Sequence, residues 1–316
     1  MISEDADTPR VALVTGSSTG IGAAIAKRLS REGFRIAVTA RAEEHTHATV
    51  GWIRGNGGTA HGFAADLSRP EEIEDLFTRF DARFERLDAL INNAGMASIA
   101  DSTSMPLRHW NRVLTLNLTA PFVTAQCAHP RMTQGEGGGG VIVNIGSVYS
   151  RMSAGRRAAY VSSKHGLIGL TKALATEWAP DGVRVVAVAP GYTETDHVRV
   201  AMEDGGFDSA AVVSRTPMGR LAHVDEVADA VSFVCSERAS FVTGSTMNRP
   251  GFSGESCVLR RRSPSKGCGQ RSSRSRTLRV RGSRTRSAGG SCCTSRPTAG
   301  LRARRARASS TGLGGG

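Results

Sequence analysis

The chain has 316 residues, 39% of them hydrophobic, and a formal net charge of +13, so it is long enough to bury a sizeable core. The positive charge lies at the end: from Phe252 onward there are fifteen arginines, one lysine and one glutamate, which leaves Met1 to Gly251 near neutral. The body therefore lacks the basic balance of a nucleic-acid-binding domain, and no apolar run approaches the ~20 residues needed to span a bilayer.

Short apolar runs rich in β-formers alternate along the body with longer segments of helical periodicity. The predicted strands are Val11–Thr15, Arg35–Thr39, Ala60–Ala64, Ala89–Ile91, Val141–Ile145, Val183–Ala187 and, with the weakest pattern, Thr246–Asn248. The predicted helices are Ile21–Arg31, Pro70–Phe84, Leu107–Ala128, Ala158–Trp178 and Val224–Cys235. Continuous Val/Ile/Leu runs are typical of strands buried on both faces. This alternation predicts an α/β fold with a doubly wound parallel sheet of the Rossmann type.

Between Gly191 and Pro217 the sequence has no strong periodicity. In a doubly wound fold this segment would lie beyond the carboxyl end of a strand, where a substrate lid is expected.

A glycine-rich loop, Thr15-Gly16-Ser17-Ser18-Thr19-Gly20-Ile21-Gly22, joins the first predicted strand to the first predicted helix. Gly16 permits a tight turn, Gly20 lets backbone approach a pyrophosphate, and Gly22 allows close helix packing. We expect cofactor contacts from Gly16, Ser17, Ser18, Thr19, Gly20, Ile21 and Gly22. A glycine triplet alone is also compatible with a purely structural strand–helix turn.

Two positions bear on which dinucleotide is bound. Ala40-Arg41 follows the second strand, where an acidic residue would bind the ribose hydroxyls of NAD; Arg41 instead suits a 2′-phosphate and favours NADP, with NAD as the alternative. Arg41 could also be a solvated surface residue. Asp66 and Leu67 follow the third strand, where the adenine is expected, although Asp66 could equally cap the following helix.

Four residues form a candidate catalytic set. Tyr160 and Lys164 are four residues apart and share one face of a predicted helix, where the cation is expected to lower the phenol pKa toward the working range. Ser147 could donate a hydrogen bond to a carbonyl oxygen, and Asn117 could hold a water that supplies protons to Lys164. Taken singly, each also has a structural explanation: a helix-surface pair, a turn serine and a core asparagine.

Six motifs in order make the chain resemble the short-chain dehydrogenase/reductase family, including its 3-oxoacyl reductase-like members. They are Thr15-Gly16-x3-Gly20-Ile21-Gly22, Asn92-Asn93-Ala94-Gly95, Asn117, Ser147, Tyr160-x3-Lys164 and Pro190-Gly191-Tyr192-Thr193-Glu194-Thr195. The resemblance implies an Asn117/Ser147/Tyr160/Lys164 tetrad and hydride transfer at the nicotinamide C4. It also implies cofactor contacts from Asn93, Ala94, Gly95, Tyr160, Lys164, Pro190, Gly191, Thr193 and Thr195, and a homo-oligomer, commonly a tetramer.

The sequence departs from the family pattern twice. Many NADP-dependent relatives carry a basic residue where Thr19 stands, so the NADP prediction depends on Arg41. Val242-Thr243-Gly244 matches a motif near the family's C-terminus, but Arg249-Pro250-Gly251 breaks away from it, which puts the last strand's role in assembly in doubt.

These features predict a short arm over residues 1–9, a dinucleotide-binding catalytic domain over 10–251 and an Arg/Ser/Gly-rich tail over 252–316. The tail contains too few apolar residues to pack and is predicted to be disordered. It could bind nucleic acid through phosphates, be an inert appendage, or be the product of a shifted reading frame; specific nucleic-acid binding is not expected.

The predicted function is oxidoreduction of a ketone and secondary-alcohol pair, a small-molecule substrate such as a 3-oxoacyl thioester. The alternatives are a sugar or polyol dehydrogenase and, with less support, a non-catalytic dinucleotide sensor. Arg156 and Arg157 could favour an anionic substrate, or be exposed arginines at a helix start. The polar, acidic N-terminus and the isolated Cys127 and Cys235 of the body favour a cytoplasmic protein without a membrane segment. No metal site is expected.

Overall fold

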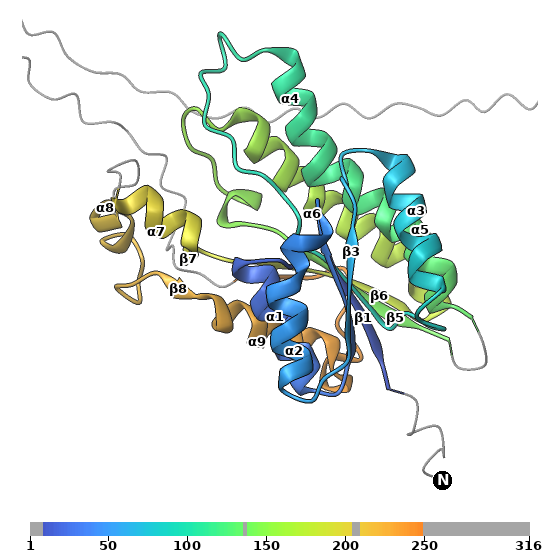
Figure 1. Ribbon diagram of the computed structural model, residues 1–316. Helices are drawn as coiled ribbons and strands as arrows, with labels where there is room; N and C mark the ends of the chain where they lie inside the picture. The colour runs from blue at the N-terminus through green and yellow to red at the C-terminus, as the bar shows by residue number, and fades with distance from the viewer. Residues whose placement is uncertain (1–8, 135–137, 204–208, 249–316) are drawn as a thin grey trace, which may run out of the picture. The chain divides into compact units, whose positions relative to one another are not determined.

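Seven parallel strands form the central sheet of the computed structural model, which describes residues 9–134, 138–203 and 209–248 (Figure 1). The order across the sheet is β3-β2-β1-β4-β5-β6-β9. The strands are β1 Val11–Val14, β2 Arg35–Ala40, β3 Ala60–Ala64, β4 Ala89–Asn92, β5 Gly140–Ile145, β6 Val183–Ala189 and β9 Thr246–Asn248. The doubly wound fold and each of the predicted strands are confirmed. The order reverses between β1 and β4, and this switch point is where such sheets bind ligands.

Helices cover both faces of the sheet (Figure 1). One face is covered by α1 (Gly20–Arg31), α2 (His47–Gly55) and α9 (Val224–Cys235). The other is covered by α3 (Pro70–Asp81), α5 (Ala120–Met132) and α6 (Ala158–Trp178). The helices predicted at α1, α3, α6 and α9 are confirmed, with ends that shift by at most three residues.

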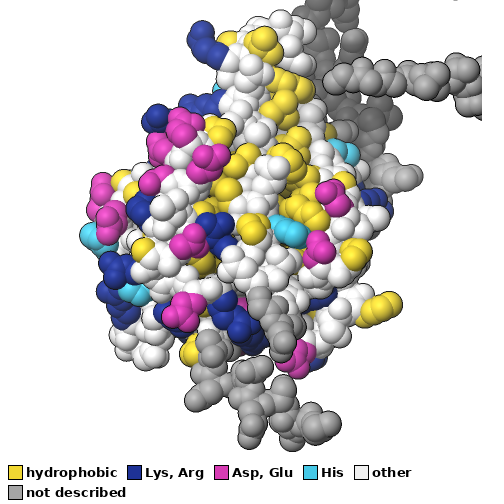
Figure 2. All heavy atoms as spheres, turned by 90° about the vertical axis from the view of Figure 1, so that its right-hand side faces the viewer, with side chains coloured by type: hydrophobic (Ala, Val, Ile, Leu, Met, Phe, Trp, Pro, Cys, Tyr) yellow, Lys and Arg dark blue, Asp and Glu magenta, His cyan; other side chains and the backbone are white. Residues whose placement is uncertain are grey.

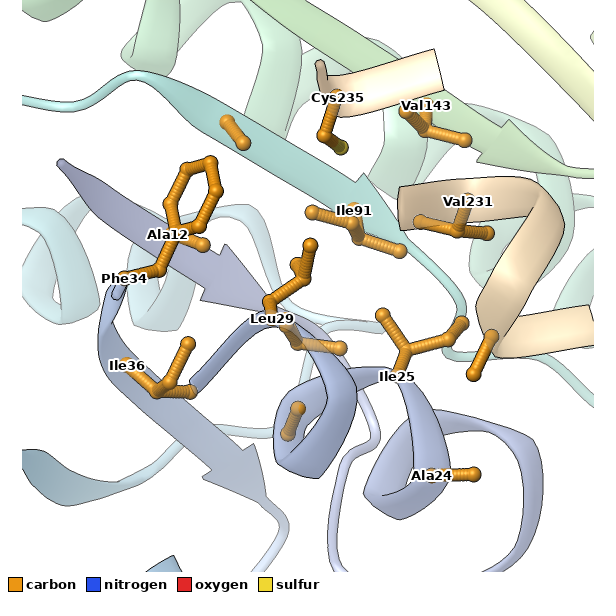
Figure 3. Packing of buried hydrophobic residues seen from close by; sticks show 14 of the residues in the cluster. Ala12, Ala24, Ile25, Leu29, Phe34, Ile36, Ile91, Val143, Val231 and Cys235 are labelled. Atoms are coloured by element: carbon orange, nitrogen blue, oxygen red, sulfur yellow. The ribbon is translucent and has the colours of Figure 1, made fainter. Parts of the chain in front are cut away.

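The core on the first face shows how α1 and α9 are fixed to the sheet (Figure 3). Ile25 and Leu29 of α1 lie beside Val231 of α9 and against Ile36 and Ile91 of the sheet, and none of these side chains is exposed. Each buried aliphatic side chain of this size stabilises the fold by about 1.5–3 kcal/mol. The core therefore holds the N-terminus of α1 at the carboxyl end of β1.

The single helix predicted over Leu107–Ala128 is wrong in one respect. The structure has α4 (Leu107–Leu114), a π-helical turn (Thr115–Thr119) and then α5. A π turn contains one residue more than an α-helical turn. The apolar residues before and after it keep their helical spacing almost unchanged, so the periodicity of the sequence does not reveal the π turn. Asn117 lies in this turn and is buried, and π turns occur frequently at functional sites.

Several short elements were not predicted from the sequence. α2 buries only Thr49, Val50 and Ile53, too few for a clear helical pattern. Within Gly191–Pro217 the structure has β7 (Thr193–Glu194), α7 (Asp196–Glu203) and α8 (Ser209–Val213), and β7 pairs with β8 (Ala222–His223). The role of this segment as a lid stays a prediction.

Charges of both signs are interspersed on the body, as Figure 2 shows for the face turned toward its viewer. Ion pairs such as Arg79–Asp75 and Arg131–Asp81 join them. Within the described ranges no helix is long and apolar enough to cross a membrane. The tail predicted over 252–316, Arg249 and the arm up to residue 8 lie outside the described residues.

Candidate active site

The glycine loop is held in place by side chains from neighbouring strands. Thr15 Oγ1 accepts hydrogen bonds from the backbone N–H groups of Asn93 (2.9 Å) and Ala94 (3.0 Å). Asn93 Nδ2 in turn donates to the carbonyl oxygens of Thr15 (3.0 Å) and Gly16 (2.9 Å). Ser17 Oγ donates to Val14 O and accepts from Thr39 N, which ties the loop to β2. The loop therefore has one fixed shape set by β1, β2 and β4.

Positive φ angles explain two of the three glycines, and close packing explains the third. Gly16 and Gly20 have positive φ angles of +59° and +55°, which side chains rarely adopt. A Cβ atom at Gly22 would lie 2.3 Å from the Gly16 carbonyl oxygen and 2.5 Å from Asn93 Nδ2. A side chain at Gly22 would therefore push the loop away from α1.

The N-terminus of α1 suits an anion. Its N-cap residue, Thr19, makes no side-chain capping hydrogen bond, and the first turn contains no acidic residue. Its backbone N–H groups and the positive end of the helix dipole are thus available to a phosphate. Thr19 is exposed and Ser18 half-buried, whereas Ser17 is buried and contributes to the loop's structure. Ile21 packs on the core beneath the loop. These features fit the pyrophosphate of a dinucleotide.

The predicted cofactor residues after β2 and β3 lie in different environments. Arg41 is exposed, and no ion pair involves it in the described part of the chain. The Asp66 carboxylate accepts hydrogen bonds from Ser68 N (3.0 Å) and Ser68 Oγ (2.7 Å), and the side-chain bond is the main cause of its lowered pKa. Leu67 is buried in the core against α3. Asp66 thus stabilises its own turn, and the Leu67 side chain faces away from solvent.

Ser147 and Tyr160 meet at the carboxyl end of β5. Ser147 is the N-cap of a short 3₁₀ helix (Val148–Ser150) and accepts a hydrogen bond from Tyr149 N (3.2 Å). A side-chain hydrogen bond links Ser147 to Tyr160 and lowers the Tyr160 pKa, but burial has the larger effect and raises that pKa above its ordinary value. A serine hydroxyl and a phenol thus converge on one point, as the sequence predicts.

Lys164 lies near the face of the Tyr160 ring and is 5% exposed. Its Nζ atom is 5.9 Å from the ring centre and donates to the Ile145 carbonyl oxygen (2.8 Å). Burial lowers the pKa of Lys164 to about 8. The expected net lowering of the Tyr160 pKa is not found, because burial of the phenol outweighs the effects that lower that pKa. The two residues still lie together, with Lys164 buried and Tyr160 half-buried.

Both polar atoms of the Asn117 amide form hydrogen bonds within the protein. Its Oδ1 accepts from Met96 N (2.8 Å), and its Nδ2 donates to Met96 O (3.0 Å) and Ser163 Oγ (3.1 Å). Gly95 lies over this amide: a Cβ atom there would be 3.1 Å from Asn117 Oδ1 and 3.8 Å from Lys164 Nζ. Asn117 therefore joins the loop after β4 to α6 beside Lys164, and its role in holding a water stays a prediction.

The segment from Pro190 to Thr195 closes the other side of the site. The Pro190 carbonyl accepts from Val148 N (2.9 Å), beside Ser147. Thr193 is buried and donates to Gly191 O (3.2 Å). Thr195 approaches the glycine loop, since its Cγ2 would lie 3.5 Å from a Cβ atom at Gly20. The segment therefore connects the catalytic residues with the glycine loop.

Two tyrosines in the site were not predicted. The Tyr149 and Tyr192 hydroxyls are 2.6 Å apart, and the Tyr149 ring lies edge-on to Tyr160 with 6.1 Å between ring centres. With Tyr160 these are the three tyrosines of the chain. Tyr149 and Tyr192 are far apart in sequence and meet because β5 and β6 are neighbours. Both tyrosines follow strands that the fold places side by side. That position, read together with the expected strand order, is the signal that could have suggested their contact.

A buried amide network under the site was also missed. Asn92 Nδ2 donates to Asn144 Oδ1 (3.0 Å) across β4 and β5, and Asn144 Nδ2 donates to Thr171 Oγ1 (3.0 Å) on α6. Thr124 Oγ1 of α5 donates to Asn92 Oδ1 (2.7 Å). The network fixes α5 and α6, and with α6 the pair Tyr160 and Lys164, against the sheet.

Comparisons with known proteins agree with this geometry. The family model described as short chain dehydrogenase matches residues 10–205. The chain is 35% identical to D-threitol dehydrogenase of Mycolicibacterium smegmatis over 238 residues, which cover 75% of this chain and 90% of that protein. It is 36% identical to the 3-oxoacyl-acyl-carrier-protein reductase of Escherichia coli over 239 residues, or 76% of this chain and 95% of the relative.

A solved structure from Agrobacterium tumefaciens, described as a 2-deoxy-D-gluconate 3-dehydrogenase with bound NADP, superposes with a TM-score of 0.70 and 38% identity. The superposition covers 77% of this chain and 95% of that one. The family model spans more than half of the chain and includes the glycine loop, Ser147, Tyr160 and Lys164. The chain therefore belongs to the short-chain dehydrogenase/reductase family, whose members are NAD(P)-dependent enzymes that act on CH–OH groups.

Proposed function

We propose that the protein interconverts a ketone and a secondary alcohol with NADP(H), and that Tyr160 transfers the proton. The observation that carries this proposal is the convergence of the Ser147 hydroxyl and the Tyr160 phenol above buried Lys164. In the reductive direction NADPH, when bound, supplies a hydride to the carbonyl carbon. Tyr160 gives its phenolic proton to the carbonyl oxygen, so that the ketone gains one hydride and one proton.

The chain's other groups support this proton transfer. Ser147 donates a hydrogen bond to the same carbonyl oxygen and holds it near Tyr160. The ammonium of Lys164 stabilises the phenolate that remains on Tyr160. The raised pKa of Tyr160 keeps the phenol protonated before reduction. Asn117 positions Lys164 indirectly, through Met96 and Ser163.

NADP is proposed over NAD because Arg41 follows β2 where an acidic residue would otherwise bind the ribose. The exposed guanidinium carries no ion pair in the described ranges, so it is available to a 2′-phosphate. The related A. tumefaciens structure with bound NADP supports the same choice.

Two substrate classes remain candidates, a sugar or polyol derivative and a 3-oxoacyl thioester, and the relatives include both kinds. The exposed Glu177 near the end of α6 disfavours an acidic carrier protein there. A non-catalytic sensor is disfavoured because Ser147, Tyr160 and Lys164 are all present.

The test is a panel of ketoses, oxo acids and 3-oxoacyl thioesters assayed by NADPH absorbance, with Tyr160→Phe as the comparison. We expect Tyr160→Phe to bind NADPH as the wild type does while turnover falls by roughly 10²–10⁴-fold. A variant that retains more than a third of wild-type turnover, with chemistry rate-limiting, would contradict the role of Tyr160.

A further inference from the structure

The positively charged side chain of Arg157 lies next to the three tyrosines of the candidate site. Arg157 immediately precedes α6 and is half-buried. Its guanidinium carbon is 5.1 Å from the centre of the Tyr149 ring, and that ring lies 6.1 Å from Tyr160 and 6.3 Å from Tyr192. One aromatic ring therefore separates the Arg157 charge from the proton donor.

No acidic side chain neutralises this charge in the described part of the chain. Arginines elsewhere on the body form ion pairs, as Arg131 does with Asp81 and Arg220 with Glu226. Arg157 forms none of the ion pairs of the described residues. Burial raises the pKa values of Tyr160 and Tyr192, and the positive charge of Arg157 acts on both in the opposite direction. Arg215 contributes a second positive charge near Tyr192. The Arg157 charge therefore lies beside the tyrosines without a carboxylate partner among the described residues.

Arg156 provides a contrast at the adjacent position. It is exposed, its charge acts on Asp101, and its carbonyl accepts a hydrogen bond from Ala100 N (2.9 Å). It is the one non-glycine residue of the described ranges with a positive φ, +63°. The two successive side chains therefore lie in different surroundings: Arg156 is exposed near Asp101, and Arg157 lies over the Tyr149 ring.

We infer that Arg157 determines substrate specificity by binding the carboxylate of a short oxo acid, or of the corresponding hydroxy acid, whose reacting carbon lies at Tyr160. A half-buried guanidinium that forms no ion pair with the described residues can bind a ligand carboxylate through two parallel hydrogen bonds. The Tyr149 and Tyr192 hydroxyls lie on the ring that contacts Arg157 and on its neighbour, and they can hydrogen-bond the hydroxyl groups of a sugar acid. This inference rests on the proposed function and narrows its substrate to an anionic carbonyl compound.

The test compares substrates that differ in the carboxylate alone. 5-Keto-D-gluconate and L-sorbose differ in a carboxylate against a CH2OH group, and acetoacetate and methyl acetoacetate differ in one negative charge. We expect the wild type to show a higher kcat/KM for the charged member of each pair that it reduces. Arg157→Gln should lower kcat/KM for the charged member by about tenfold to a hundredfold, the range for a charge-assisted hydrogen bond, and for the neutral member by less than about threefold.

Two control variants separate a specific role from a structural one. Arg156→Gln removes the same charge one residue away and should leave the ratio of the two kcat/KM values unchanged. Arg157→Lys keeps the charge without the planar fork and should recover part of the preference. Calorimetric titration of D-gluconate into the NADP-saturated protein should show weaker binding in Arg157→Gln, independently of turnover.

The outcomes distinguish this inference from the proposed function. Reduction of neutral ketones without preference for the charged partner, or an equal loss for both in Arg157→Gln, overturns the carboxylate site and leaves the proposed function in place. Reduction of 3-oxoacyl thioesters alone also overturns it. If NADPH binds but no ketone in the panel, charged or neutral, is reduced, the proposed function fails and this inference fails with it.

Discussion

Lys164 Nζ donates a 2.8 Å hydrogen bond to the carbonyl oxygen of Ile145, the last residue of β5. Ser147 follows two residues later and meets Tyr160 from the same strand end. One strand terminus therefore positions both the lysine on α6 and the serine beside the phenol. The relative placement of the three side chains depends on the packing of α6 against β5 and β6.

The first prediction concerns pH. Burial disfavours the ammonium of Lys164 and lowers its pKa to about 8, so the side chain is charged below that pH and neutral above it. Reduction leaves a phenolate on Tyr160, and the Lys164 ammonium stabilises that phenolate. We therefore expect kcat/KM for reduction to fall as the pH rises through about 8. In Lys164→Arg the charge persists, and the alkaline limb should move to higher pH even if the rate is lower. A limb at the same pH in this variant would assign it to another group.

The second prediction concerns cofactor choice. A charge-assisted hydrogen bond from Arg41 to a 2′-phosphate contributes roughly 1.5–3 kcal/mol, about tenfold to a hundredfold in affinity. We expect NADPH to bind more tightly than NADH, and Arg41→Ala to remove most of the difference, as measured by fluorescence titration. Arg69→Ala is the matched control, because Arg69 also lies near Asp66 but already pairs with Glu71 and Glu72. Equal wild-type affinity for the two dinucleotides would make Arg41 a simple surface residue.

The third prediction concerns the buried amide network. Thr171 and Thr176 both lie on α6, and the hydroxyl of each donates to the carbonyl four residues earlier. Only Thr171 is buried and accepts from Asn144, so Thr171→Ala leaves a buried amide donor unsatisfied. We expect it to lower the free energy of unfolding by about 1–3 kcal/mol in urea denaturation, and Thr176→Ala to change it by less than about 0.5 kcal/mol. Similar values for the two variants would argue against the network.

The fourth prediction concerns the glycine loop. In Gly22→Ala the new Cβ atom would clash with the Gly16 carbonyl and with Asn93 Nδ2, so the loop must shift. We expect a loss of NADPH affinity of at least about tenfold and a lower melting temperature, because backbone clashes of this kind typically cost 1–3 kcal/mol or more. Gly51→Ala on α2 meets no atom within 4 Å and should bind NADPH normally. Unchanged affinity in Gly22→Ala would mean that the loop does not hold the pyrophosphate.

Sequence patterns predict the strands well because buried parallel strands such as β1 and β5 are continuous runs of apolar residues. Helices with many buried positions, such as α6, are equally clear. α2 was missed because only three of its residues are buried, and the π turn at Asn117 was missed because one extra residue scarcely disturbs the apolar pattern. Local patterns therefore predict elements whose burial is extensive, and fail where burial is slight.

The residues of the candidate site also fall into two groups, those that local spacing predicts and those that only the tertiary structure brings together. Ser147, Tyr160 and Lys164 were found because their spacing is itself a motif. The contacts of Tyr149 with Tyr192, and of Asn92 with Asn144, join residues 43 and 52 positions apart. Those pairs depend on strand order and register, which no local pattern contains. The raised pKa of Tyr160 likewise depends on burial and not on its spacing from Lys164.

The hydrogen bonds that fix the glycine loop have a consequence for how the protein folds. The loop is held by Asn93, whose contacts with Thr15 and Gly16 span 78 and 77 residues, and not by residues of its own β1–α1–β2 unit alone. A nascent chain that has made only this first unit lacks the groups that close the loop. Contacts of such long range form late, because their loop-closure entropy must first be overcome. Affinity for dinucleotide should thus arise only once β4 has joined β1, which couples ligand binding to completion of the sheet's centre.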